Sequence, residues 1–165
     1  MLYRSRRRDK KVRRDGSSDV CATDLGKVQL SSAIKINFEQ IHPENLQNTM
    51  DDLRSIAEPR YLHQTTIYNG SEVAFFENLI DAPFTSPAGE WRIHFHVPIH
   101  MQHIGSLQTT QDDLRHSIDV LSLAGVSDWE VETYTWDVLP TVMQEGELVE
   151  SITKELLWAT PLINQ

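Results

Sequence analysis

The sequence lacks the residues and motifs that several common kinds of site require. Its 165 residues include one cysteine, Cys21, so the rest of the chain can form neither a disulfide nor a thiolate metal site. No stretch approaches the roughly 18 apolar residues of a membrane-spanning helix, and no signal-peptide pattern is present. Serine-nucleophile, glycine-rich phosphate-loop and H-E-x-x-H motifs are also missing. We therefore expect a cytoplasmic protein that uses other chemistry.

Charge is distributed unevenly along the chain. Residues 1–26 hold eight of the 15 Lys and Arg residues and four of the 24 Asp and Glu residues, which leaves seven basic and twenty acidic side chains for residues 27–165. Nucleic-acid surfaces depend on clustered Lys and Arg. The acidic body therefore argues against a nucleic-acid partner and stays compatible with a small-molecule metabolite.

Residues 1–26 form a basic leader with almost no apolar periodicity. A disordered arm and a targeting or nucleic-acid tail are two interpretations of such a stretch. The string from Gly16 to Leu25 also resembles a peptide that arises when sequencing-adapter DNA is translated. We expect the leader to be non-native or disordered, and assign it no function.

From Lys27 onward, short apolar strands alternate with amphipathic helices. Strands are expected over residues 28–36, 91–99 and 129–136, and a hairpin over residues 61–76 with its turn at Asn69-Gly70-Ser71. Pro43 and Thr110 are expected to start helices, the second as a variant of the capping box. The stripes expected to be buried are Leu46, Met50, Leu53 and Ala57; Leu114, Ile118, Leu121 and Ala124; and Leu148, Ile152 and Leu156.

This alternation predicts an α/β fold with a parallel sheet and helical crossovers. Three parallel strands and a hairpin cannot close a barrel, which needs eight strands and roughly 250 residues. The chain is therefore either a small open α/β sandwich or a piece of a larger protein. The candidate chemistry favours the piece.

Four polar residues on two expected strands suggest a metal site. His94 and His96 are two apart and share one face of their strand, and Glu130 and Glu132 repeat this arrangement on the last strand. An imidazole pair and a carboxylate on neighbouring strands can converge on one cation. An ordinary packed histidine pair is the competing interpretation.

Three further residues are weaker candidates. Gln29 interrupts an apolar strand on the face where a barrel lumen would lie, and His63 is expected at the start of the hairpin strand. His100 follows the strand that carries the histidine pair. Gln29 and His63 could equally be polar groups satisfied within the fold, and His100 faces either substrate or solvent.

Four strings in the body resemble one known family, the C-terminal half of the EboE metabolite-traffic family. The strings are Lys27–Ala33, Tyr61–Gln64, Trp91–Pro98 and Glu130–Pro140, and the resemblance spans roughly residues 27–160. The last two strings are long and distinctive. The family is similar to xylose-isomerase-like barrels, which include sugar (phosphate) isomerases, epimerases and endonuclease-IV-type enzymes.

The resemblance implies that residues 27–165 are the C-terminal portion of a (β/α)8 barrel, about three βα units plus an inserted hairpin. Val28, Trp91 and Trp129 would begin the sixth, seventh and eighth strands. The missing N-terminal half of the barrel would supply the other metal ligands, so the chain alone is expected to be inactive.

The resemblance also implies roles for individual residues. His94 and His96 correspond to seventh-strand metal ligands and Glu132 to the carboxylate of the final strand. Gln29, a further candidate metal ligand, stands where relatives often have a histidine, so the usual metal set is altered here.

The favoured hypothesis is a metal-dependent isomerase or epimerase acting on a sugar-like or polyol-like metabolite. A divalent ion (Mn²⁺, Zn²⁺ or Mg²⁺) would act as a Lewis acid, and His63 or His100 would transfer a proton. Two alternatives are a non-catalytic barrel that binds or hands on a prenylated metabolite and an endonuclease-IV-like metal hydrolase. A cupin-like β-barrel fits less well, because the amphipathic helices oppose an all-β fold.

Overall fold

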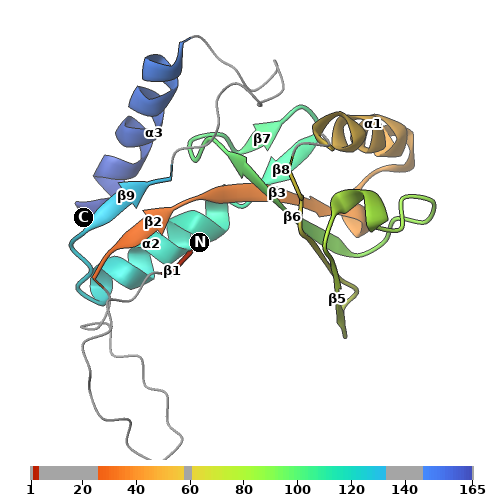
Figure 1. The fold of residues 1–165 in the computed structure, drawn as a ribbon, viewed down its shortest axis with the longest axis horizontal. Coiled ribbons are helices and arrows are strands. Elements are labelled where there is room, and N and C mark those ends of the chain that lie inside the picture. Colours follow the sequence, from red (N-terminus) through yellow and green to blue (C-terminus); the bar gives the residue numbers. More distant parts are fainter. Residues whose placement is uncertain (1, 4–25, 58–60, 133–146, 165) are drawn as a thin grey trace, which may run out of the picture.

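The computed structural model describes residues 2–3, 26–57, 61–132 and 147–164 (Figure 1). In these ranges the chain forms a six-stranded sheet, a three-stranded sheet and three α-helices. Each sheet lies against an apolar core of its own. This mixture of sheets and helices confirms the α/β class in its coarse form.

The larger sheet has the strand order β5-β4-β6-β3-β8-β7, and neighbouring strands in it are antiparallel. Helix α1 (Leu46–Ile56) contributes Met50 and Leu53 to the core that also holds Ile34 and Trp91. The six strands are β3 (Ser32–Asn37), β4 (Thr65–Tyr68), β5 (Val73–Phe76), β6 (Glu90–Val97), β7 (His103–Ile104) and β8 (Leu107–Thr109).

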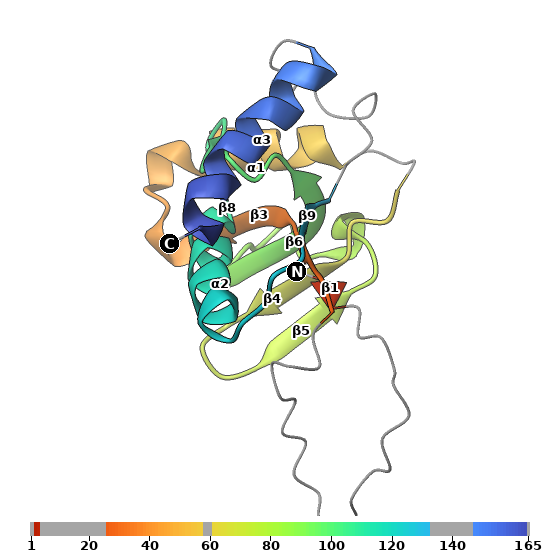
Figure 2. The same ribbon diagram turned by 90° about the vertical axis from the view of Figure 1, so that its left-hand side faces the viewer.

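The smaller sheet holds the one parallel pair among the described strands. Strand β2 (Val28–Leu30) runs parallel to β9 (Trp129–Val131), with Val28 opposite Trp129. Strand β1 (Leu2–Tyr3), which belongs to the predicted leader, pairs antiparallel with β2. Helices α2 (Gln111–Leu123) and α3 (Leu148–Ile163) lie against each other beside this sheet and share its core (Figure 2).

The single strand expected over residues 28–36 is divided at Ser31 between the two sheets (Figure 1). Its alternation of buried and half-buried residues continues through the break, but β2 packs on one core and β3 on the other. Just beyond the break, Ala33 donates its N–H to Thr110 Oγ1 (2.9 Å) and accepts the Thr110 N–H (2.8 Å). Thr110, at the start of α2, therefore binds the backbone N–H and carbonyl of Ala33, through which a continuous strand would pair with its neighbour.

The expectation of a parallel sheet is wrong for most of the described strands. The strand near Trp91 (β6) runs antiparallel to β3 and β4, and the strand from Trp129 (β9) pairs with β2 rather than with β6. Tight turns at Gly70 and Gly105 join β4 to β5 and β7 to β8, and such turns return a strand antiparallel. The described residues form no closed barrel, and membership of a larger barrel stays a prediction.

The hairpin is confirmed, although its first strand starts later than expected. Strand β4 begins at Thr65 rather than at Tyr61 and pairs with β5. Asn69 Oδ1 accepts the backbone N–H groups of Ser71 and Glu72 at 3.1 and 2.9 Å, and Gly70 takes a φ of 95°. The turn thus forms where the Asn-Gly pair predicted it.

The first two helices bury most of the predicted stripes. Met50, Leu53, Leu114, Ile118 and Leu121 are buried, whereas Leu46 is exposed and Ala57 and Ala124 are half-buried. The capping box is wrong: Thr110 makes no side-chain cap, because its hydroxyl accepts the Ala33 N–H instead. Three short 3₁₀ turns complete the helical elements of the described residues: η2 (Phe38–Gln40), η3 (Pro43–Asn45) and η4 (Leu79–Asp81).

The stripe predicted for α3 is wrong. Leu148 and Leu156 are exposed and Ile152 is half-buried. The helix instead buries a face with two small residues and a carboxylate, because this face comes close to α2 and to the end of β6. The buried residues of α3 are Ser151, Glu155, Ala159 and Leu162.

Two predictions extend beyond the described residues. Most of the leader (residues 4–25) and residues 133–136 of the last expected strand lie outside them. Within the described residues, every helix is too short or too polar to cross a membrane.

Candidate functional site

The candidate site lies at the carboxyl ends of the two parallel strands. Ser31 directly follows β2 and Glu132 directly follows β9, and the Glu132 N–H donates to the Leu30 carbonyl at 2.9 Å. Because parallel strands end at the same edge of a sheet, these two side chains lie near each other. The carboxyl ends of parallel strands are also where ligand sites of α/β proteins usually form.

Strand β6 brings the histidine pair to this edge. Phe95 and Val97 are buried in the core, so the alternating side chains of His94 and His96 leave the opposite face, as predicted. Their Nε2 atoms are 2.8 Å apart and their ring centroids 4.7 Å apart. Within hydrogen-bond distance, one ring donates an N–H and the other accepts it.

The second ring nitrogen of His96 faces the ends of β2 and β9. His96 Nδ1 lies 3.1 Å from Ser31 Oγ and 3.5 Å from Glu132 Oε2. The imidazole of His96 therefore links strand β6 to the edge of the other sheet. His94 and Glu132 both lie beside His96, but the expectation that β6 and β9 are neighbouring strands is wrong, because β9 pairs with β2.

The surroundings of His94 favour its neutral form. His94 is exposed overall, but partial burial of its imidazole lowers the pKa of His94 and the neighbouring His96 lowers it further, while Glu132 acts in the opposite direction. A neutral imidazole is the form that can bind a metal ion. Near neutral pH, His94 is thus ready to act as a ligand.

The spacing of the pair fits one ion. Two nitrogens that bind an ion at about 2.0–2.1 Å are separated by about 2.9 Å when the angle between them is a right angle and by about 3.4 Å when it is tetrahedral. The observed 2.8 Å between His94 Nε2 and His96 Nε2 is close to the first value. In the part of the chain that the structure describes, no group of three or more His, Cys, Asp or Glu side chains could hold an ion. The site is therefore a two-histidine site that needs further donors.

Gln29 is not brought to the histidine pair by any contact in the structure. It is half-buried in the middle of β2, opposite Glu130 of β9, and lies two residues before Ser31. Glu130 forms an ion pair with Lys27. These residues continue the polar face of the β2–β9 pair away from the site, so the role of Gln29 as a ligand stays a prediction.

His63 lies behind strand β6. Its side chain is 4% exposed, its Nδ1 is 3.4 Å from the His94 carbonyl oxygen, and its ring centroid is 5.0 Å from that of Phe95. Phe95 belongs to the face of β6 opposite the histidine pair. The structure therefore places His63 against the core rather than beside His94 and His96.

His100 is half-buried in the turn that follows β6. Two buried side chains hold the backbone of Ile99, the residue just before it: Glu155 Oε2 accepts the Ile99 N–H at 3.1 Å, and Gln111 Nε2 donates to the Ile99 carbonyl at 3.0 Å. This turn is thus fixed from both α2 and α3. The sequence interpretation missed Glu155, although its position four residues after Ser151 and four before Ala159 is a visible signal.

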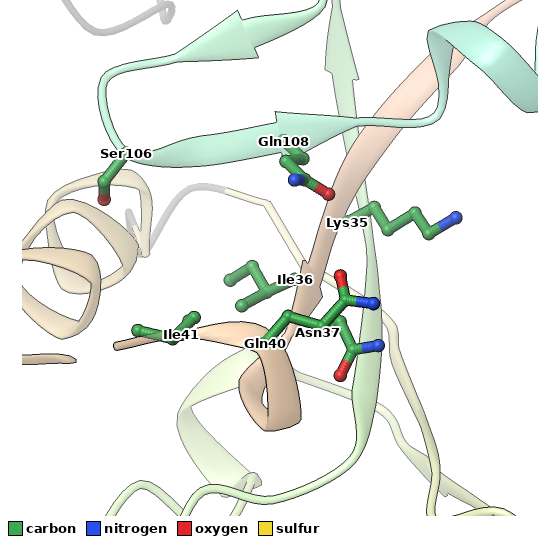
Figure 3. A pocket seen from close by; sticks show the side chains of 7 residues that line it. All are labelled: Lys35, Ile36, Asn37, Gln40, Ile41, Ser106 and Gln108. Atoms are coloured by element: carbon green, nitrogen blue, oxygen red, sulfur yellow. The ribbon is translucent and has the colours of Figure 1, made fainter. Parts of the chain in front are cut away.

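A small pocket occurs elsewhere, between β3, β8 and η2 (Figure 3). Its volume of about 70 Å³ is well below the several hundred Å³ typical of metabolite sites. It shares no residue with the histidine pair, so it adds nothing to that site. Its lining consists of Lys35, Ile36, Asn37, Gln40, Ile41, Ser106 and Gln108.

The described residues define an α/β protein with a histidine pair at the carboxyl ends of two parallel strands. No family model, curated protein or solved structure matches this chain. The chemistry of the site therefore has to be argued from its own geometry.

Proposed function

We propose that this chain supplies part of a divalent-metal site in an isomerase- or epimerase-like barrel protein of the metabolite-traffic type. The observation that carries the proposal is the 2.8 Å separation of His94 Nε2 and His96 Nε2 at the edge where β2 and β9 end. Imidazole nitrogens are ligands for Zn²⁺ and for several other transition metals. The lowered pKa of His94 supports the same role.

Glu132 adds negative charge to the site, and His100 is a candidate for proton transfer. Glu132 places a carboxylate beside His96, which favours a cation at this edge. When bound, the ion would act as a Lewis acid on a carbonyl or hydroxyl oxygen of a sugar-like or polyol-like metabolite. Of the two proton-transfer candidates, His100 sits in a turn that is held from two helices, whereas His63 packs against the core.

The barrel origin is supported by the smaller sheet. Strands β2 and β9 are parallel, and helices α2 and α3 share one apolar core with them. Their other face carries the polar side chains of Gln29 and Glu130. In this proposal the antiparallel six-stranded sheet is an extension from the barrel, and the missing half supplies the remaining ligands.

A metal titration tests the proposal. The purified chain, first freed of metal with a chelator, is titrated with Zn²⁺, Mn²⁺ and Mg²⁺ in competition with an indicator dye. We expect one ion per chain, and a loss of affinity of more than about 100-fold in the variant with both His94→Ala and His96→Ala. His116→Ala, which changes an exposed histidine of α2, is the matched control.

The result also separates the main hypothesis from its alternative. If the wild-type chain binds no ion, or if the double variant binds as tightly as the wild type, the metal-site proposal is wrong. A non-catalytic barrel that binds a metabolite would then be the better hypothesis.

A further inference from the structure

The two ring nitrogens of His96 face different groups. Nε2 faces His94, whereas Nδ1 faces Ser31 Oγ and Glu132 Oε2. An ion held by both Nε2 atoms would therefore lie on the His94 side of the ring. Glu132 lies on the other side, which agrees with the lack of a three-ligand group among the described residues.

The chemistry of Glu132 selects one tautomer of His96. A carboxylate is only an acceptor, so a favourable approach of Glu132 to Nδ1 requires a proton on that nitrogen. Ser31 can accept from the same N–H, because a hydroxyl oxygen accepts as well as donates. A neutral imidazole protonated at Nδ1 has its lone pair on Nε2, where it can bind an ion.

Glu132 Oε2 is well suited to this orienting role. The atom is buried, and no described residue donates a hydrogen bond to it. His96 Nδ1 lies 3.5 Å from it. A buried acceptor without a donor is costly, and a modest approach of the Nδ1–H of His96 would satisfy it.

We infer that Glu132 is a positioning residue, which with Ser31 holds His96 in the Nδ1–H tautomer, rather than a metal ligand. The inference rests on the proposed metal site and changes its ligand set. Carboxylates that orient a ligating histidine in this way fix its ring and raise its basicity.

The metal preference follows from this ligand set. Carboxylate and water oxygens suit Mg²⁺ and Mn²⁺, whereas imidazoles without a carboxylate favour Zn²⁺ and its neighbours in the transition series. The inference therefore selects Zn²⁺ over Mg²⁺ for the part of the site that this chain provides.

Two measurements on the whole chain test the role of Glu132. The first uses Co²⁺ as a spectroscopic probe and Zn²⁺ for affinity, in the wild type and in Glu132→Ala, Glu132→Gln and His96→Ala. For Glu132→Ala we expect Zn²⁺ affinity to fall about 10- to 100-fold with the Co²⁺ absorption bands unchanged. Glu132→Gln should recover most of the affinity, because its amide oxygen still accepts from Nδ1.

The matched control is Glu130→Ala, which removes the neighbouring carboxylate on the same face of β9 and should leave Zn²⁺ affinity unchanged. If Glu132→Ala shifts the Co²⁺ bands and weakens binding as much as His96→Ala, Glu132 is a ligand and the inference is wrong.

The second measurement needs no metal. Long-range ¹⁵N–¹H spectra of the chelator-treated protein at pH 8 should show His96 as the Nδ1–H tautomer, and Glu132→Ala should shift it toward the Nε2–H form. A wild-type His96 in the Nε2–H form would overturn the inference even if an ion binds. If His96 is in the Nδ1–H form but no ion binds, the metal-site proposal is wrong and the role of Glu132 in orienting His96 still holds.

Discussion

The Glu155 carboxylate accepts the backbone N–H of Ile99 at 3.1 Å, although Glu155 is only 1% exposed. This contact joins α3 to the end of β6, directly before His100. Gln111 of α2 binds the carbonyl of the same residue at 3.0 Å. The backbone N–H and carbonyl of Ile99 are thus both held by side chains, one from each of two helices.

The first prediction concerns this contact. Glu155→Ala leaves the buried Ile99 N–H without its acceptor and should lower the free energy of unfolding by about 1–3 kcal/mol, measured by urea denaturation. Glu150→Ala, which removes an exposed ion pair with Lys154 on the same helix, should cost less than about 0.5 kcal/mol. Equal effects of the two substitutions would contradict a structural role for Glu155.

The second prediction concerns pH. Burial and His96 lower the pKa of His94 in the folded chain, so the unfolded chain binds more protons as pH falls below about 6.5. The free energy of unfolding of the metal-free protein should therefore be unaffected by His94 at pH 7.5 and should decrease as pH falls from 6.5 through the lowered pKa. Urea denaturation between pH 7.5 and 5.5 measures this dependence.

His94→Gln is the control for the pH effect. The free energy of unfolding of this variant should depend less on pH between 7.5 and 5.5, because the substitution removes the group that titrates. A slope that is the same in the variant and in the wild type would show that His94 contributes nothing to it.

The third prediction compares two glycines with positive φ. Gly70 (φ 95°) lies in the hairpin turn, and a Cβ there would meet no atom within 4 Å. A Cβ on Gly89 (φ 72°) would overlap the backbone carbonyl of Tyr68. Gly70→Ala should cost about 1–2 kcal/mol from backbone strain alone, and Gly89→Ala should cost clearly more. Thermal unfolding of both variants checks the order, and the reverse order would contradict the described packing.

Local patterns predicted the features that depend on neighbouring residues in the sequence. Period-two alternation placed His94 and His96 on one face, because successive side chains of a strand point to opposite sides. The Asn69-Gly70 pair predicted the hairpin turn, since Gly70 readily adopts a positive φ. Helix α2 (Gln111–Leu123) followed from its apolar spacing.

The features that depend on tertiary contacts did not follow from these patterns. Alternation continues unbroken through Ser31, so it gives no sign that the strand changes sheets there. The apolar residues of α3 predicted the wrong face, because Ala159 and Leu162 pack in the core shared with α2 and Glu155 meets a backbone N–H. The direction of β6 shows only in its antiparallel pairing with β3 and β4, which its own alternation does not reveal.

The central claim is that the Nε2 atoms of His94 and His96 bind one ion together. X-ray absorption at the zinc edge of the Zn²⁺-loaded chain tests it most directly, because imidazole scattering can be counted. The account predicts two imidazole ligands at about 2.0–2.1 Å in the wild type, and one in His94→Ala. A spectrum with no imidazole ligand in the wild type, or one unchanged by His94→Ala, would contradict it.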